Sequence, residues 1–291
     1  MQLLLFNLIR FICLLLAVAF YTLFERKILG YIQFRLGPNK VRFAGVLQPI
    51  ADAVKLICKS WFIPLQGNKL FFIFIPICSL ILAGLLFLLI ENSYFYREQI
   101  GALFFLIFLA LGVFPICLAG WRSNRMYRKL GGYRSLAQSI SYEVAIFFLI
   151  LFPILLIKSI RLFSSISTIS LFNFMILIIM VVVVLAETNR APFDLSEGES
   201  ELVSGFNTEY SGSGFTILFL AEYAQMLVIS LIVASLYISS RFSMIVRIIV
   251  FSLLLIIRRA YPRLRYDVLI RFIWVSSLPL INAFLLVVPF I

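Results

Sequence analysis

The sequence predicts an all-α polytopic membrane protein with about eight transmembrane helices and one amphipathic interfacial helix. The chain has 291 residues, of which 63% are hydrophobic and 13% charged, and this composition excludes an ordinary soluble domain. Apolar runs of bilayer-spanning length, about 20 residues each, recur along the whole sequence. They lack the two-residue alternation of barrel strands, so they must be helices in hydrocarbon. We expect a single membrane domain over residues 1–291.

The expected spans follow one another with short connections. They are Leu3–Phe24, Leu70–Ile90, Ile100–Ala119, Ser139–Ile157, Leu171–Ala186, Phe215–Ile238, Met244–Ile257 and Val268–Pro289. The first is expected to stay in the mature protein, because Glu25–Lys27 follows it where a small-residue cleavage site would be needed. The seventh is short and contains Arg247, and it extends to about Ala260 if its arginines reach the headgroups.

Basic residues give the orientation. Eighteen of the 25 Lys and Arg residues lie in the loops after odd-numbered spans, and five lie in the loops after even-numbered spans when Arg247, in the seventh span, is counted with them. The positive-inside rule then places the odd loops in the cytoplasm, or in the matrix for an organelle protein, and both termini on the opposite side. Basic loops beside membrane helices explain the net charge of +12, so we expect no nucleic-acid partner.

Cysteine and histidine usage limits the cofactors. The four cysteines are scattered without a C-x-x-C pair, and the chain has no histidine. A metal site, a histidine-ligated haem or an iron–sulfur cluster held by this chain alone is therefore not expected. If the protein serves a redox process, its partners hold the redox centres.

Acidic side chains gather at the inner membrane face. Glu143 lies about four residues, or roughly 6 Å, inside its span, and Glu222 lies about seven residues, or roughly 10 Å, along its span. Glu25 and Glu187 stand at inner helix ends. A carboxylate in hydrocarbon costs about 3 kcal/mol, and such groups form either a proton path or a static pair with an arginine. An exposed acid at a helix end is the ordinary alternative for Glu25 and Glu187.

The loop 187–214 is the most acidic part of the chain. Six of the 13 acidic residues lie within it: Glu187, Asp194, Glu197, Glu199, Glu201 and Glu209. The acids alternate with apolar residues, and turn signals stand at Ala191–Pro192 and Gly198. We expect a packed loop whose carboxylates engage inner-face arginines; a solvated acidic turn is the alternative.

The segment Gly45–Trp61 has the pattern of an amphipathic helix. At 100° per residue its apolar residues form one stripe, with Asp52, Lys55 and other polar residues opposite. Such a helix lies in the interface plane. It serves either as a lipid-surface anchor or as the wall of a side entrance with Asp52 and Lys55 near its inner rim.

Several motifs together resemble one family, the first membrane subunit of respiratory complex I (NADH:ubiquinone oxidoreductase) in its mitochondrially encoded form. The motifs are ERKILGYIQFRLGPNKV (25–41), LQPIADAVKL (47–56), AQSISYEV (137–144), AETNRAPFDLSEGESELVSGFNTEY (186–210), AEYAQM (221–226) and IRRAYPRLRYD (257–267). They occur in order over both halves of the chain. The chain departs from the family in being short around Ser239–Ser243, and in having Arg42 where a small residue is commoner.

The resemblance implies a function. Such a subunit binds no cofactor itself; flavin, NADH and the iron–sulfur clusters belong to partner subunits. It forms the membrane part of a quinone-access tunnel beneath hydrophilic subunits on the matrix side of the mitochondrial inner membrane. Antiporter-like membrane subunits and lipid are its other partners. Quinone chemistry is expected to change the charge near the acidic loop and to shift protons on the buried glutamates, which titrate as a coupled set.

Individual residues match the family's positions. The tunnel positions are Arg26, Arg35, Asp52, Lys55 and Phe219, and the buried glutamates are Glu143, Glu187 and Glu222. Three other functions stay open at this point: the membrane anchor of a related hydrogenase complex, a stand-alone ion or proton transporter, and a purely structural anchor.

Overall fold

Helices account for nearly all of the regular structure. The computed structural model describes residues 2–41, 45–60, 69–91, 101–122, 126–157, 171–190, 192–194, 210–237, 252–257 and 261–287. Within these ranges no residue lies in a strand. The helices are α1 (Gln2–Ile32), α2 (Gln48–Ile57), α3 (Lys69–Glu91), α5 (Gly101–Arg122), α6 (Met126–Ile157), α7 (Leu171–Glu187), α9 (Gly212–Tyr237), α11 (Tyr266–Arg271), the π-helix η4 (Phe272–Ser277) and α12 (Leu278–Val287).

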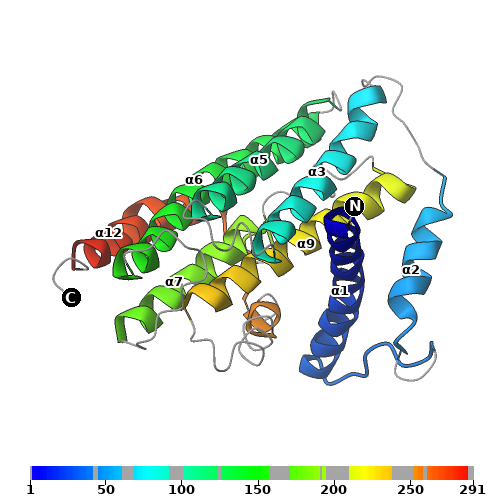
Figure 1. Cartoon of the computed structure of the whole chain (residues 1–291), viewed down its shortest axis with the longest axis horizontal. Helices are drawn as coiled ribbons and strands as arrows, with labels where there is room; N and C mark the ends of the chain where they lie inside the picture. The colour runs from blue at the N-terminus through cyan, green and yellow to red at the C-terminus, as the bar shows by residue number, and fades with distance from the viewer. Residues whose placement is uncertain are drawn as a thin grey trace.

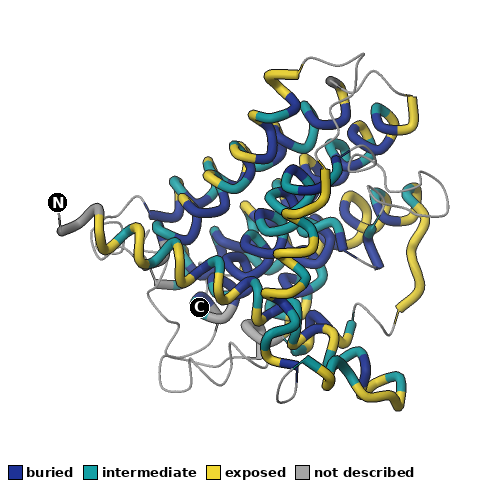
Figure 2. The backbone as a smooth tube through the Cα atoms, turned by 90° about the vertical axis from the view of Figure 1, so that its right-hand side faces the viewer, coloured by how far each residue is buried: buried dark blue, intermediate teal, exposed yellow. Residues whose placement is uncertain are grey.

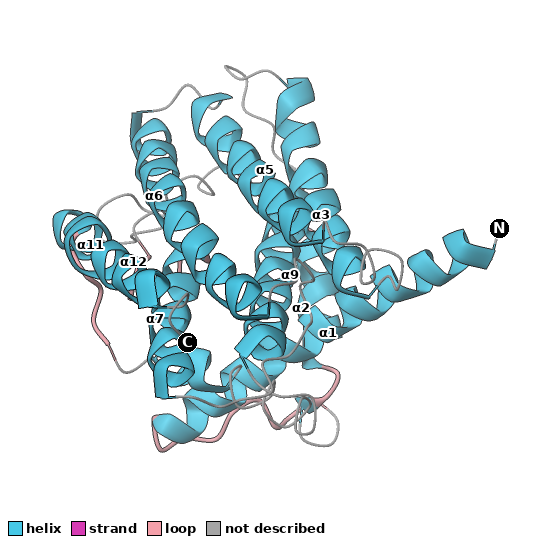
Figure 3. Cartoon of the chain, turned by 60° about the vertical axis from the view of Figure 1, so that its left-hand side comes forward, coloured by secondary structure: helices cyan, strands magenta, loops and turns pink. Residues whose placement is uncertain are grey.

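Six helical spans in the described ranges are long and apolar enough to cross a membrane. They lie in α1, α3, α5, α6, α9 and the continuous helix Tyr266–Val287 made by α11, η4 and α12 (Figure 3). The apolar helix α7 has 17 residues and is shorter than the others. Of the expected span Met244–Ile257 only residues 252–257 are described, and these are helical. The predicted all-α polytopic fold is confirmed.

Two helices are longer than their apolar runs. α1 continues to Ile32, and α6 begins at Met126, well before the run that starts at Ser139. The first turns of α6 contain Arg128 and Gln138, which lower the local hydrophobicity although both side chains are buried. A search for apolar runs therefore places the start of this helix too late.

The bundle core is formed by α3, α5, α6, α7 and α9, which lie side by side in Figure 1. Residues such as Leu149, Val183 and Ile232 are fully buried between them. α5 and α6 are in close contact at Gly120 and Gly132. A Cβ on Gly120 would stand 3.0 Å from the Cα of Gly132, so this crossing depends on the missing side chains.

The outer surface of the bundle is strongly apolar. On α1 only 17% of the spanning window is buried within the chain, and Figure 2 shows this helix projecting from the bundle with exposed residues along it. Large exposed side chains include Phe6 and Phe114, at 62% and 61%. Lipid or neighbouring subunits must cover this surface, because water does not solvate it favourably.

α2 is the expected amphipathic helix. It starts at Gln48, with Pro49 in its first turn, where proline fixes a helical φ without losing an internal hydrogen bond. Pro49 is buried against the chain, whereas Ile50, Val54 and Ile57 are exposed. This apolar face points away from the chain, as in a helix that lies in the membrane interface. α2 packs beside α1 and α9 (Figure 1).

Candidate functional site

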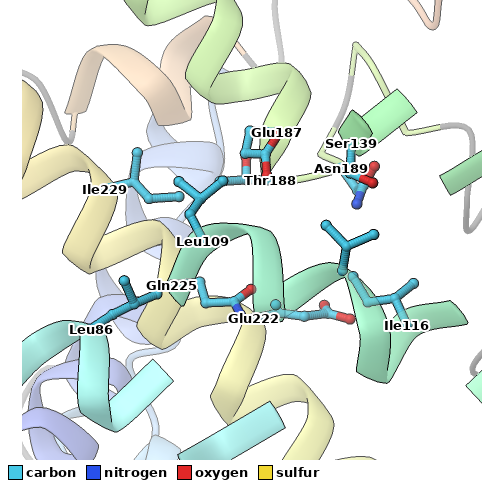
Figure 4. A pocket seen from close by; sticks show the side chains of 12 residues that line it. Leu86, Leu109, Ile116, Ser139, Glu187, Thr188, Asn189, Glu222, Gln225 and Ile229 are labelled. Atoms are coloured by element: carbon cyan, nitrogen blue, oxygen red, sulfur yellow. The ribbon is translucent and has the colours of Figure 1, made fainter. Parts of the chain in front are cut away.

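A cavity with a mixed polar and apolar lining lies inside the bundle and is about 40 Å³ in volume, enough for water molecules, since one needs about 10–15 Å³. Figure 4 shows the side chains around it. Its lining comes from five helices and the residues after α7: Leu86, Leu109, Gly112, Val113, Ile116, Ser139, Glu187, Thr188, Asn189, Glu222, Gln225 and Ile229. The cavity therefore joins two of the intramembrane glutamates.

One of these glutamates is paired with a buried arginine. Arg190 Nη2 donates a hydrogen bond of 3.0 Å to Glu222 Oε2. The Arg190 guanidinium also lies 4.6 Å from the ring centroid of Tyr223 and 5.9 Å from that of Phe219. Because Arg190 is only 5% exposed, this charge interacts in a medium that screens weakly.

Tyr223 links this pair to α1. Its hydroxyl donates a 2.7 Å hydrogen bond to Glu25 Oε2, and both side chains are buried. The alternative of an exposed acid at the helix end is therefore wrong for Glu25. Tyr21 packs edge-on against Tyr223, with ring centroids 5.8 Å apart. Glu25, Tyr223, Arg190 and Glu222 form a contact chain from α1 to the cavity.

Glu143 and Glu187 have a different environment. Their carboxylates are near enough to influence one another electrostatically. Among the described residues, no hydrogen-bond donor reaches Glu143 Oε1 or Glu187 Oε2, and neither side chain forms an ion pair. The static pair with an arginine is thus found at Glu222 within the described structure and is not found at Glu143.

Gln138 fixes this region. Its side chain is fully buried, and Nε2 donates to the carbonyls of Ala186, at 2.7 Å, and Phe193, at 2.9 Å. It thereby ties α6 both to the last turn of α7 and to the start of the acidic loop. Asn189, with φ of +50°, turns the chain out of the helix, a conformation that asparagine tolerates better than most residues.

The beginning of the acidic loop is packed. Asp194 pairs with Arg263 at 3.4 Å, and the Pro192 carbonyl accepts a hydrogen bond from the Leu264 amide. The expected pairing of loop carboxylates with inner-face arginines is present at Asp194. The other four acids of the loop lie outside the described residues: Glu197, Glu199, Glu201 and Glu209.

The end of the loop is held by aromatic stacking. Tyr210 stacks on Phe72 with centroids 4.1 Å apart, and the Arg128 guanidinium lies 5.5 Å from the Tyr210 ring centroid. Burial raises the pKa of Tyr210 above its ordinary value, and Arg128 opposes this shift to a smaller degree. Arg128 itself is 1% exposed.

Three of the five tunnel positions, Arg26, Asp52 and Phe219, contact one another or a residue of the site. Arg26 on α1 pairs with Asp52 on α2, whose other oxygen accepts from Gln48 Nε2 at 3.0 Å. Phe219 packs against Tyr223, with ring centroids 4.4 Å apart. Arg35 and Lys55 are exposed, as Arg26 is, and Arg35 donates to Gln33 Oε1.

The chain matches a known family over nearly its whole length. Residues 6–289 match the family described as NADH dehydrogenase. The chain belongs to the NADH dehydrogenase family. Curated relatives are each named NADH-ubiquinone oxidoreductase chain 1. That of Aedes aegypti is 43% identical over 284 residues, covering 94% of this chain and 91% of the relative. That of Heterololigo bleekeri is 44% identical over 295 residues, covering 94% and 92%, and that of Branchiostoma lanceolatum is 44% identical over 280 residues, covering 93% and 90%. The resemblance seen in the motifs is confirmed.

Sequence reasoning missed several polar side chains of this NADH dehydrogenase family member. Tyr223 directly follows Glu222, but nothing in the apolar pattern of its helix singles it out as a functional residue. On α6 the signal was a periodicity, since the buried polar residues recur at helical spacing on one face: Arg128, Ser135, Gln138, Ser139 and Tyr142. A polar stripe in a membrane helix faces the bundle interior.

Proposed function

We propose that this chain is the membrane subunit of a mitochondrial-type, proton-translocating NADH-ubiquinone oxidoreductase that walls the quinone path and passes the charge change of quinone reduction to buried glutamates. The family match and the names of the relatives support the enzyme. They favour it over the hydrogenase anchor and the stand-alone transporter. Within the inner membrane, the basic loops support an orientation with both termini facing the intermembrane space.

The adjoining surfaces of α1, α2 and α9 suit a quinone path. A quinone has a flat polar head and a long apolar tail, so its path needs aromatic and polar groups at one end and apolar surface along the rest. Arg26 and Asp52 join α1 to α2, and Phe219 with Tyr223 presents aromatic faces on α9. The exposed apolar face of α2 supplies a membrane-side approach, with Asp52 and Lys55 on its polar side.

The contact chain from Glu25 to the cavity is the observation that carries the proposed coupling. Quinone reduction takes up protons as well as electrons, so charge changes beside the path. Glu25 directly precedes the path residue Arg26 on α1, and its bond to Tyr223 connects it to Arg190 and Glu222. A charge change at one end alters the field at the other, because the intervening groups are buried and weakly screened.

Glu143 and Glu187 are the proton-accepting end of this arrangement. A carboxylate in hydrocarbon without a counter-charge is held more readily with a proton than without one. The cavity supplies room for water between Glu187 and Glu222. Their protonation is coupled to that of the loop acids. Together these groups form the start of a charged path toward the antiporter-like partner subunits. Flavin, NADH and the iron–sulfur clusters are placed in the hydrophilic partners; among the described residues, no group of three His, Cys, Asp or Glu side chains has the arrangement of a metal site.

The test compares Glu143→Gln and Glu187→Gln with an exposed-acid control, Asp267→Asn, in the assembled enzyme in inner-membrane vesicles. Asp267 is 57% exposed and pairs with Arg265 at the surface. Both glutamine variants should assemble and oxidise NADH normally with an artificial acceptor, but lose quinone-linked proton uptake. The control should keep all three properties. Full proton uptake in both variants would refute the proposed role.

A further inference from the structure

A second concave site lies on the outside of the bundle, between α5 and α6 and apart from the internal cavity. It is lined by Cys117, Trp121, Lys129, Gly132, Tyr133 and Leu136. Gly132 lines the cleft at its close crossing with Gly120, where a Cβ on Gly120 would stand 3.0 Å from backbone atoms of α6. The backbones of the two helices therefore meet directly beside the cleft.

The polar end of the cleft has the residues of a membrane interface. Trp121 is 60% exposed and Tyr133 is 58% exposed. Trp121 lies next to the end of α5, and Lys129 and Tyr133 lie near the start of α6. Tryptophan and tyrosine favour the headgroup level of a bilayer, and a lysine there extends its ammonium toward phosphate.

An apolar track leads from the cleft along both helices. On α5, exposed side chains recur at helical spacing from the level of Trp121: Phe114, Leu111, Ile107 and Leu103. On α6, they recur in the same way from Tyr133: Ile140, Val144 and Phe147. Residues at these spacings share one helix face, so each helix presents one continuous apolar stripe below an aromatic residue.

We propose that this cleft binds one anionic phospholipid, with its phosphate at Lys129 and an acyl chain along the two apolar stripes. The Lys129 ammonium, the Tyr133 hydroxyl and the Trp121 indole N–H are the donors for the headgroup. The acyl chain covers surface that water does not solvate favourably. A free phosphate would use only the donors and leave the apolar stripes without a role.

A partner helix fits the same surface less well. Interfaces between proteins carry few charged residues at their centre, and burying an unpaired ammonium costs several kcal/mol. Lys129 lines the cleft together with Trp121 and Tyr133, so a helix seated there would bury it. A lipid phosphate neutralises the charge at the place where the cleft presents it.

The test uses the intact enzyme exchanged into nanodiscs of phosphatidylglycerol or phosphatidylcholine, with lipid retained after detergent extraction counted by native mass spectrometry. The variant is Lys129→Gln, and the matched control is Lys69→Gln, which removes an exposed lysine at the start of α3. One basic residue near anionic lipid contributes about fivefold in binding. We expect retained phosphatidylglycerol to fall about fivefold in Lys129→Gln, and to be unchanged in Lys129→Arg and Lys69→Gln.

Four results would overturn the proposal. They are equal retention of the two lipids by the unmodified enzyme, equal loss in both glutamine variants, displacement of phosphatidylglycerol by inorganic phosphate, and a partner helix seated in the cleft of the assembled enzyme. If Lys129→Gln prevents assembly, Tyr133→Phe keeps the ring and removes only the hydroxyl donor. It should lower phosphatidylglycerol retention and leave assembly intact; unchanged retention would count against the site.

Discussion

The ion pair of Arg190 and Glu222 gives a prediction about how the bundle tolerates loss of one charge or of both. Arg190 is 5% exposed, the Glu222 side chain is 21% exposed, and the bonded atoms are 3.0 Å apart. Breaking a buried pair by removing one partner costs about 3–5 kcal/mol, whereas replacing both partners is often nearly neutral. We therefore expect Arg190→Met to be strongly destabilising.

The second single variant should cost less. In Glu222→Gln the amide oxygen still accepts from the guanidinium, so a hydrogen bond to a charged group, worth about 1.5–3 kcal/mol, is kept, and the loss stays below the roughly 3–5 kcal/mol of a broken buried pair. Arg190 also keeps its position over the Tyr223 ring. The double variant should be more stable than the sum of the two losses implies, with a coupling of about 1–3 kcal/mol.

A double-mutant cycle on heat-induced loss of the assembled complex, followed on native gels, measures this coupling. The control cycle uses the surface pair of Arg265 and Asp267, whose side chains are 83% and 57% exposed. Such a pair should show no measurable coupling, since solvent screens it. Additive losses at Arg190 and Glu222 would refute the reasoning, because they would mean that neither charge depends on the other.

Three further variants test the network around the cavity. Tyr223→Phe removes the hydroxyl bonded to Glu25 at 2.7 Å but keeps the ring, so protons pumped per NADH should fall while assembly stays normal; an unchanged ratio would exclude the link. Gln138→Leu removes the donor to the Phe193 carbonyl and one of two donors to the Ala186 carbonyl, which keeps the Asn189 amide, and should cost about 1–3 kcal/mol, measured as earlier heat-induced disassembly, whereas wild-type heat resistance would contradict the structure. Gly112→Val should fill part of the cavity, where an added Cβ already stands 3.3 Å from Gln225 Nε2. It should slow quinone-linked proton uptake more than Gly112→Ala does, and equal rates would argue against water in the cavity.

The sequence predicts the helices because an apolar run in hydrocarbon must pair its own backbone polar groups, and a helix does this within one segment. It fails at the start of α6, where Arg128 and Gln138 interrupt the apolar run although both are buried. The sequence does predict that the glutamates lie on one side of the membrane, since topology follows from the basic loops. It does not separate Glu222, which has an arginine partner, from Glu143, which has none among the described residues, because that partner is set by how the residues after α7 fold against α9.

The shortness of α7 has a consequence for the bilayer around the enzyme. At 1.5 Å per residue its 17 residues span about 25 Å, less than the roughly 30 Å of hydrocarbon in a typical membrane. Thr188 and Asn189 line the cavity at the end of this helix, so a bilayer thicker than the helix brings hydrocarbon to the level of the cavity unless the lipids thin locally. The rate of quinone-linked proton uptake should therefore depend on membrane thickness. Lipids with longer acyl chains would bring hydrocarbon to the polar end of α7, and lipids with shorter chains would leave that end at the level of the headgroups. Vesicles of graded acyl length would reveal this dependence in the rate of quinone-linked proton uptake.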